Sequence, residues 1–471
     1  MKKLLFIIAV VFLAASCKDK TIKITGNVKN PNADKLEVFY YKDFLKSETE
    51  SFTIELDEVN SFIVNLPLKT SEFVYLSMPP RTIKLYIRPD SKVYVEFDAE
   101  QRDSMPFISG INSHESNFLV KYNFEIEKEH GYRNLLAKIA ELEVNEALAF
   151  LEEVKNKKIN YLKSFPNYDL MEKEFVDNIM KSINYEQYNL KLTYPNYYQF
   201  VKKLDAKPEL PEDYYNFLVA EDLFDDNAIK IKEYRDFLDG YVSFGVSEII
   251  SKMGEEFKGS FYKLQFDYAN ANLSGESKIF VLSKCAYFSF GIDSFEQSEA
   301  LYNEYKEIAT PGIYKDIVDN IYNKKLSLMP GNPAPDFTIN DIDGNVVKLS
   351  DYKGKVVYLD FWASWCGPCI REMAPAKELK KRMVDYNNDI IYLYISIDTD
   401  AAKWKEAIEK HEITGVHANV SGRNQPIPGA YNVLFIPTFY IIGKDGNIFD
   451  NNPPRPSSPE IDGVLLKALE G

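Results

Sequence analysis

Hydrophobic and polar residues alternate in short runs along the first part of the chain. These runs cover residues 21–30, 35–41, 61–68, 72–78, 82–89 and 92–97, and Asn, Asp, Pro and Ser residues separate them. Because successive side chains of a strand point to opposite faces, a period of two indicates half-buried strands, and the separating residues favour turns. We therefore predict an all-β module over residues 18–105, built as a small antiparallel sandwich or an open barrel.

A helical period replaces this alternation over residues 110–325. Residues 132–165 contain neither Gly nor Pro. The apolar residues that share one helical face in this stretch are Ala147, Leu151, Val154, Tyr161, Leu162 and Phe165. Lys158 interrupts the face. This spacing is typical of amphipathic helices, so we predict a central all-α region that serves as a spacer or as a docking unit.

Pro and Gly residues mark a boundary in the sequence "LMPGNPAPDF". Both residue types break helices, so we place a linker at residues 326–335 and a further domain at residues 336–471. In that domain the nearly continuous apolar run "KVVYLDFW" indicates a central strand that is covered on both faces. A helix pattern to about Met383, a second apolar strand "DIIYLYISID", a helix capped by Asp400 and a closing hairpin follow. This order predicts an α/β fold for the last part of a multidomain chain.

The N-terminus carries the features of a targeting segment. Two lysines precede an apolar stretch at residues 4–15 that is too short to span a bilayer, and small residues lead up to Cys17. An ordinary cleaved signal peptide has the same features. The sequence "LAASC", however, resembles a bacterial lipoprotein signal, which implies a signal peptide over residues 1–17 with Cys17 as the acylation site. Lys18 after Cys17 favours the outer membrane, so we expect a periplasm-facing lipoprotein of the cell envelope.

The formal net charge of -15 narrows the expected partners. Proteins that bind nucleic acid need a surplus of Lys and Arg to neutralise phosphates, whereas this chain has 56 Lys and Arg residues against 71 Asp and Glu residues. We therefore expect no nucleic-acid partner. We expect contact with the membrane only through the lipid anchor, because no other stretch is long and apolar enough to span a bilayer.

Four cysteines bear on the chemistry. Apart from Cys17, Cys285 lies in the apolar run "FVLSKCAYFSF", which predicts a small buried side chain. Cys366 and Cys369 form a Cys-x-x-Cys pair. By spacing alone, such a pair suits a metal clip, a structural disulfide or a redox dithiol.

The histidines give no support to a metal clip. A structural zinc site needs four ligands, usually from two Cys-x-x-Cys pairs. The sequence has no second pair, and His114 and His130 have no Cys or His at ligand spacing. His411 and His417 are predicted to be surface residues. We therefore expect no metal site and no cofactor, and a purely structural disulfide is the alternative to a redox dithiol.

The segments around the pair carry a specific resemblance. The sequence "WCGPC" follows an apolar strand, and "IPTFYII" comes later in the chain. Together they resemble the thioredoxin superfamily, and residues 331–471 resemble its extracytoplasmic branch, which includes the membrane-tethered reductases of cytochrome c maturation. The β-rich region resembles a module of unknown role that precedes such domains in exported Bacteroidota proteins. The resemblance implies a thioredoxin-like fold for the last domain.

A cysteine at the N-terminus of a helix suits disulfide exchange. The thiolate is the attacking form, and free backbone N–H groups and the helix dipole stabilise it. Cys366 holds this position, so we predict that it is the nucleophile. Cys369 lies one turn further on the same face, where it resolves the mixed disulfide. Gly367 and Pro368 match the pair found in reducing thioredoxins, and Pro368 suits the first helical turn.

Two carboxylates lie at useful distances from the cysteines. Asp360 ends the apolar strand, and Glu372 follows Cys369 by three positions on the same helical face. A water-exposed Asp at a strand end and a solvated Glu on a helix are the plain alternatives. A buried carboxylate with a raised pKa would instead accept and return the proton of Cys369. The resemblance implies Asp360 for thioredoxin itself and Glu372 for the cytochrome-maturation branch, and we rank Asp360 first.

Further site residues follow from the same resemblance. In the thioredoxin family the Pro of the Ile-Pro-Thr motif is cis and faces the cysteines, which implies a cis bond before Pro437. The backbone of Ile436 is then expected to pair with an incoming peptide like an added strand. Trp365 and the two residues between the cysteines are predicted to form the contact surface, whereas Trp362 is predicted to pack in the core.

These features predict a membrane-anchored, extracytoplasmic thiol-disulfide oxidoreductase. We expect it to act as a reductase on disulfide-containing exported proteins, with apocytochrome c among the candidate clients. Because exported compartments are oxidising, such a reductase needs a separate membrane electron donor. A disulfide isomerase is one alternative. An adaptor or sensor lipoprotein that uses the fold only for docking is another, although a docking surface needs neither the cysteines nor Asp360 and Pro437.

Overall fold

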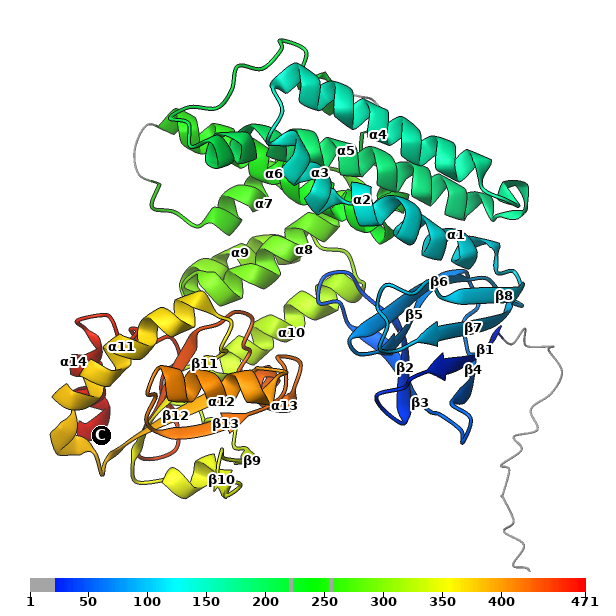
Figure 1. Cartoon of the computed structure of the whole chain (residues 1–471). Helices are drawn as coiled ribbons and strands as arrows, with labels where there is room; N and C mark the ends of the chain where they lie inside the picture. The colour runs from blue at the N-terminus through cyan, green and yellow to red at the C-terminus, as the bar shows by residue number, and fades with distance from the viewer. Residues whose placement is uncertain (1–21, 220–222, 254–256) are drawn as a thin grey trace, which may run out of the picture. The chain divides into compact units, whose positions relative to one another are not determined.

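The computed structural model of the chain describes residues 22–219, 223–253 and 257–471 (Figure 1). The chain folds as two compact units, which meet in sequence between Gly245 and Val246. The first unit holds a β-sheet region and helices, and the second holds further helices and an α/β domain. Within the described ranges, no helix is both long enough and apolar enough to cross a bilayer.

The β-sheet region consists of two four-stranded sheets with the orders β4-β1-β7-β8 and β3-β2-β5-β6. The strands are β1 (Ile22–Lys29), β2 (Lys35–Tyr41), β3 (Thr49–Glu55), β4 (Ser61–Leu66), β5 (Glu72–Met78), β6 (Arg81–Ile87), β7 (Lys92–Asp98) and β8 (Phe107–Ile111). Alternate residues of both sheets, for example Ile24 and Val38, form one buried apolar core. The period of two in the sequence therefore reflects two sheets that each bury one face.

The expectation of a purely antiparallel module is wrong at one pair of strands. β1 and β7 are parallel neighbours, with Ile24 opposite Val93. Five strands separate β1 from β7 along the chain, so no tight hairpin fixes their relative direction. The alternation also missed β3 and β8, which lie at sheet edges and bury few of their residues.

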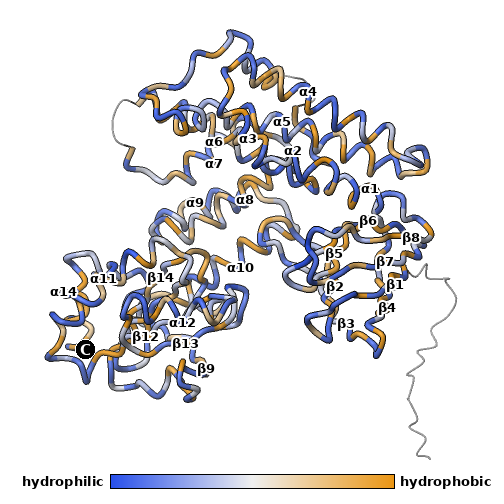
Figure 2. The backbone as a smooth tube through the Cα atoms, in the orientation of Figure 1, coloured by the Kyte–Doolittle hydropathy of each residue, from blue (hydrophilic) through white to orange (hydrophobic). Residues whose placement is uncertain are grey.

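Helices form the rest of the first unit. They are α1 (His114–Tyr122), the π-helical turn η1 (Asn123–Glu127), α2 (Lys128–His130), α3 (Tyr132–Ile139), α4 (Val144–Ser164), α5 (Lys173–Lys202) and the first part of α6 (Lys232–Met253), with short turns η2 (Tyr168–Leu170), η3 (Asn216–Val219) and η4 (Asp226–Lys230). The stretch without Gly and Pro is divided into α3 and α4, because a capping box of Glu143 and Glu146 starts α4. Figure 2 shows apolar and polar residues alternating along α4 and α5, as expected for amphipathic helices.

Lys158, which interrupts the apolar face of α4, is itself buried, with 1% of its surface exposed. Its ammonium lies 2.7 Å from Glu127 Oε1 and 2.5 Å from Glu186 Oε2. A buried charge is tolerated when it is paired and hydrogen-bonded. The interruption is therefore an internal ion cluster and not a solvent-facing position.

The second unit begins with the end of α6 and continues with α7 (Phe261–Asn272), α8 (Gly275–Ile292), α9 (Phe295–Ile308) and α10 (Ile313–Ser327). The elements of its α/β domain are β9 (Thr338–Asn340), β10 (Val346–Lys348), η5 (Leu349–Tyr352), β11 (Val356–Trp362), α11 (Gly367–Arg382), η6 (Val384–Tyr386), β12 (Ile390–Ser396), α12 (Ala401–Lys410), β13 (Val416–Asn419), α13 (Pro426–Ala430), β14 (Thr438–Ile442), β15 (Ile448–Asp450) and α14 (Ile461–Glu470). A five-stranded sheet has the order β13-β12-β11-β14-β15. Asp400 caps α12, as predicted.

The central strand β11 separates two apolar cores, and all of its residues are buried. Tyr358 and Trp362 face the core that contains both cysteines. Leu359 and Phe361 face the core on the other side of the sheet. Because side chains alternate along a strand, Asp360 shares the face of Tyr358 and Trp362, and so it lies on the same side of the sheet as the cysteines.

Candidate active site

The Cys-x-x-Cys pair lies where β11 passes into α11. Cys366 is the N-cap residue of α11 and forms a disulfide with Cys369, with a Cα–Cα distance of 5.2 Å. The backbone N–H of Cys369 donates a hydrogen bond of 3.1 Å to Cys366 Sγ. Pro368, in the first turn, has no N–H to donate. The helix therefore directs an N–H group and the positive end of its dipole at Cys366 Sγ, which favours a thiolate on this sulfur in the reduced state.

The surroundings of the pair are exposed on one side and buried on the other. Trp365 is 63% exposed, and the two residues between the cysteines are also exposed, whereas Trp362 is fully buried. Cys366 Sγ lies 3.7 Å from the carbonyl oxygen of Ile436. The peptide bond between Ile436 and Pro437 is cis, as predicted. The structure thus brings together the two segments that the sequence singled out.

Asp360 is buried, with 4% of its surface exposed. Within the described part of the chain, its Oδ1 has no hydrogen-bond partner. Burial raises the pKa of Asp360 well above its ordinary value, the charge of Lys380 opposes this rise, and the charge of Glu372 adds to it. A buried carboxyl with a raised pKa stays protonated to higher pH than usual. Its unpartnered oxygen can accept or release a proton without breaking a hydrogen bond.

Glu372 is also buried, but both of its oxygens are occupied. The backbone N–H of Ser457 donates to Oε2, and the Ser457 hydroxyl donates to Oε1, both at 3.0 Å. Ser457 lies in the loop between β15 and α14. The sequence does not point to this residue, because nothing in a Pro- and Ser-rich loop indicates which helix it will contact.

Lys380 is a second residue near the site to which the sequence alone does not point. It lies on α11, and its ammonium is 4.9 Å from the ring centroid of Tyr392 and 4.8 Å from that of Tyr394. Burial lowers the pKa of Lys380 to about 8, and the charge of Asp360 acts against this change. Lys380 is therefore a cation in partial burial whose charge stabilises the ionised form of Asp360.

The remaining candidates are Cys285, His417, a metal site and Cys17. Cys285 is buried in α8, as predicted. The expectation that His417 is a surface residue is wrong: the residue lies in β13, stacks on Tyr394 at 5.0 Å between ring centroids, and burial lowers its pKa to about 4. Among the described residues, no group of three or more His, Cys, Asp and Glu side chains is placed to hold a metal ion. Cys17 and the signal segment lie outside the described residues.

Comparison with known proteins assigns the family. Residues 329–465 match the Redoxin family. The thiol-disulfide oxidoreductase ResA of Geobacillus kaustophilus is 34% identical over 136 residues, which cover 28% of this chain and 74% of that protein. This chain belongs to the thioredoxin-like thiol-disulfide oxidoreductases. The thioredoxin-like protein YneN of Bacillus subtilis is 32% identical over 131 residues, covering 27% of this chain and 75% of that protein. A solved structure of a thiol-disulfide oxidoreductase from Bacteroides fragilis is 28% identical to this chain. The alignment covers 29% of this chain and 99% of the solved one, with a TM-score of 0.26.

One helix outside the Redoxin match reaches the site of this oxidoreductase. Phe288 of α8 packs on Phe435, with ring centroids 5.8 Å apart. Gly291 lies so close to the same ring that an added Cβ would be 2.7 Å from it. Phe435 directly precedes Ile436, so α8 supports the loop whose carbonyl oxygen lies next to Cys366 Sγ.

Proposed function

We propose that this oxidoreductase reduces disulfides in proteins outside the cytoplasm. The observation that carries the proposal is the N-cap position of Cys366, whose Sγ accepts the backbone N–H of Cys369. A thiolate held there is stabilised before it meets a substrate. The role of attacking nucleophile falls to Cys366, and that of resolving cysteine to Cys369.

The first step is attack of the Cys366 thiolate on one sulfur of a client disulfide. A sulfur–sulfur bond forms between Cys366 and the client, the client disulfide breaks, and the second client sulfur leaves as a thiolate that takes up a proton. In the second step the Cys369 sulfur, after losing its proton, attacks Cys366 Sγ. The intramolecular disulfide forms, the other client sulfur leaves, and two electrons have passed from the enzyme to the client.

The proton of Cys369 needs an acceptor, and Asp360 is the carboxylate that we assign to this role. It lies on the face of β11 that packs against the cysteines, and its Oδ1 is without a partner among the described residues. Glu372 is the second candidate, and its hydrogen bonds to Ser457 would have to break or shift before it accepted a proton. The difference in hydrogen bonding favours Asp360.

The client segment is expected to bind as an extended peptide at Ile436, whose backbone carbonyl faces the attacking sulfur. Trp365, Gly367 and Pro368 supply the exposed surface around that sulfur. Backbone pairing of this kind accepts many sequences. It suits an enzyme that acts on several exported proteins, and apocytochrome c is one candidate.

The direction of electron flow and the location complete the proposal. Gly367 and Pro368 between the cysteines favour a reductase, and a reductase in an oxidising compartment requires a dithiol electron donor in the membrane. Acylation at Cys17 would hold the chain at the outer membrane facing the periplasm. Replacing Cys17 by Ser should then release the protein from the membrane fraction and abolish labelling by a radioactive fatty acid.

Trapping of clients tests the proposed chemistry. A Cys369→Ser chain should accumulate mixed disulfides through Cys366, a Cys366→Ser chain should accumulate none, and Cys285→Ala serves as the matched control that behaves like the wild type. An absence of trapped clients would favour the alternative function, an adaptor or sensor lipoprotein that uses the fold only for docking. The reduction potential of the pair tests the direction: a value near about −270 mV supports a reductase, and one near about −120 mV overturns it.

A further inference from the structure

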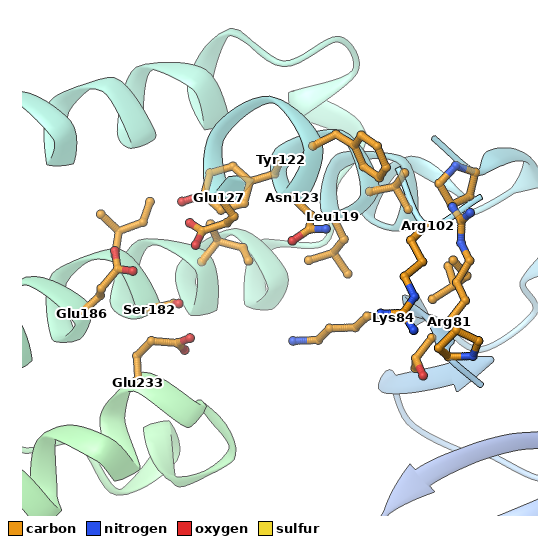
Figure 3. A pocket seen from close by; sticks show the side chains of 18 residues that line it. Arg81, Lys84, Arg102, Leu119, Tyr122, Asn123, Glu127, Ser182, Glu186 and Glu233 are labelled. Atoms are coloured by element: carbon orange, nitrogen blue, oxygen red, sulfur yellow. The ribbon is translucent and has the colours of Figure 1, made fainter. Parts of the chain in front are cut away.

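A cavity of about 530 Å³ lies inside the first unit, away from the cysteines in sequence. Its walls come from β6, from the end of α1 and the turn η1, from α5 and from the start of α6 (Figure 3). All of its lining residues precede Gly245, so the cavity belongs wholly to one unit and lies outside the Redoxin match. Cavities of about 300–1,000 Å³ are typical of small-molecule sites.

A π-helical turn forms one wall of this cavity. α1, η1 and α2 run as one continuous helix, and η1 interrupts its regular hydrogen bonding at residues 123–127. Asn123, Phe124 and Glu127, all from this turn, line the cavity. Single π turns are rare and frequently mark functional sites. Within the described residues, the side-chain amide of Asn123 has no hydrogen-bond partner and is available to a ligand.

The β6 side of the cavity is cationic. Lys84 extends from β6 into the space, and Arg102 lies on the same side (Figure 3). The Lys84 ammonium lies 4.1 Å from the ring centroid of Phe73, and no acidic side chain of the described ranges forms an ion pair with it. The loss of water around Lys84 lowers its pKa. An anionic group bound at this position would stabilise the charged form of Lys84 and so oppose the lowering of its pKa.

The opposite side carries an excess of negative charge. Glu127, Glu186 and Glu233 line it, and Figure 3 shows Glu233 pointing toward Lys84 across the cavity. Lys158 pairs with Glu127 and Glu186, whereas Glu233 makes no ion pair with any residue that the structure describes. Burial raises the pKa of Glu186 to about 7 in spite of its contact with Lys158. Two of the three carboxylates thus share one cation, and Glu233 has no ion-pair partner among the described residues.

We infer that this cavity binds a short peptide with free ends. Lys84 receives the terminal carboxylate, and Glu233 with its neighbour Glu186 receives the terminal ammonium. Leu119 and Ile183 also line the cavity and offer apolar surface for the peptide side chains. A phospholipid headgroup fits less well, because its two charges lie together at one end of an apolar chain, whereas the charges of this cavity lie on opposite walls.

Calorimetric titration of the full chain with free-ended Leu-Leu, Leu-Ala-Leu and Leu-Ala-Ala-Leu tests the inference. At least one of these peptides should bind. Acetylating its N-terminus or amidating its C-terminus should each weaken binding by about tenfold or more, because each change removes one charged hydrogen-bonding group. Failure of all three peptides to bind would overturn the inference, as would equal binding of the blocked and free forms.

Two substitutions assign the ends of the peptide. In Lys84→Met, amidation of the C-terminus should no longer matter, while N-acetylation should still weaken binding. In Glu233→Gln, N-acetylation should no longer matter, while amidation of the C-terminus should still weaken binding. Lys92→Met, on an exposed position of β7, is the matched control and should bind like the wild type. Variants that bind every form like the wild type would contradict the assignment. If a variant does not fold, the comparison of blocked and free peptides on the unchanged chain decides.

Discussion

Replacing Asp360 by Asn removes the proton acceptor that we assign to Cys369 and keeps the shape of the side chain. Asp360 lies on the cysteine side of β11, is buried, and has an Oδ1 without a partner among the described residues. General base catalysis contributes about 10²–10⁴-fold to a rate. We expect attack of Cys369 on the mixed disulfide to slow by about 10²-fold, the lower end of that range, because Glu372 remains as a poorer acceptor.

The assay follows the two phases of the reaction between the reduced protein and an aromatic disulfide that releases a coloured thiol. Formation of the mixed disulfide gives the first phase, and its resolution by Cys369 gives the second. In the wild type, the second rate should rise with pH through the raised pKa of Asp360 and then level off, because a protonated carboxyl accepts no proton. In Asp360→Asn the rise at the pKa of Asp360 should disappear, and the rate should rise and level off only with the ionisation of Cys369 itself.

Glu372→Gln is the matched control, since it removes the other carboxylate of the same interior. It should keep the rise and the plateau of the second phase but move them to lower pH, because the charge of Glu372 adds to the raised pKa of Asp360. An unchanged profile in Asp360→Asn together with loss of the rise at the carboxyl pKa in Glu372→Gln would refute the reasoning and assign the proton to Glu372. If neither variant lost this rise, neither carboxylate would be the proton acceptor of Cys369.

The same substitution has a stability signature with a definite sign. The pKa of Asp360 is raised in the folded protein, so the unfolded chain loses this proton first, at a pKa of about 3.9. Unfolding therefore becomes easier as the pH rises above about 4, until the folded carboxyl also ionises. Asp360→Asn should raise the free energy of unfolding near neutral pH, and this gain should vanish below about pH 4 in denaturant titrations.

Three further substitutions probe the contacts around the two sites. Ser457→Ala removes one hydrogen bond to the Glu372 carboxylate and should cost about 1.5–3 kcal/mol in urea unfolding. Gly291→Ala should displace the Phe435 ring, so we expect a lower kcat/KM for reduction of insulin and an unchanged rate with a small disulfide; an equal loss with both substrates would contradict a role in client binding. Lys158→Met leaves Glu127 and Glu186 facing each other and should cost about 3–5 kcal/mol in urea unfolding, with less loss at pH values below 7, where Glu186 is protonated.

Local patterns in the sequence predicted most individual elements but not all of their pairings. The alternation of apolar residues located β1, β2, β4, β5, β6 and β7, because each of these strands buries one face in the sandwich core. The parallel pairing of β1 with β7 was not predictable in this way, since it depends on strands distant in sequence. The same limit applies to Lys158, which looks like a break in an apolar face until its partners on η1 and α5 are known.

The site shows a similar division. The Cys-x-x-Cys spacing pointed to Cys366 and Cys369, and the resemblance to the thioredoxin superfamily pointed to the segment at Pro437. In the fold, the disulfide and the cis bond before Pro437 bring these segments together. Ser457 and Lys380 were missed, because their importance comes only from the tertiary contacts that they make with Glu372 and with the aromatic rings near Asp360.

The two carboxylates illustrate what tertiary structure adds to the mechanism. In sequence, Asp360 and Glu372 are both candidates, one before the cysteines and one after them, and Asp360 ranks only slightly ahead. In the fold, Ser457 supplies two donors to Glu372, whereas Asp360 has an oxygen without a partner among the described residues. An acceptor without a partner takes a proton without breaking a hydrogen bond, and it gains an O–H that can be returned to a sulfur. This asymmetry, and not the position of either residue in the motif, is the physical reason to assign the proton of Cys369 to Asp360.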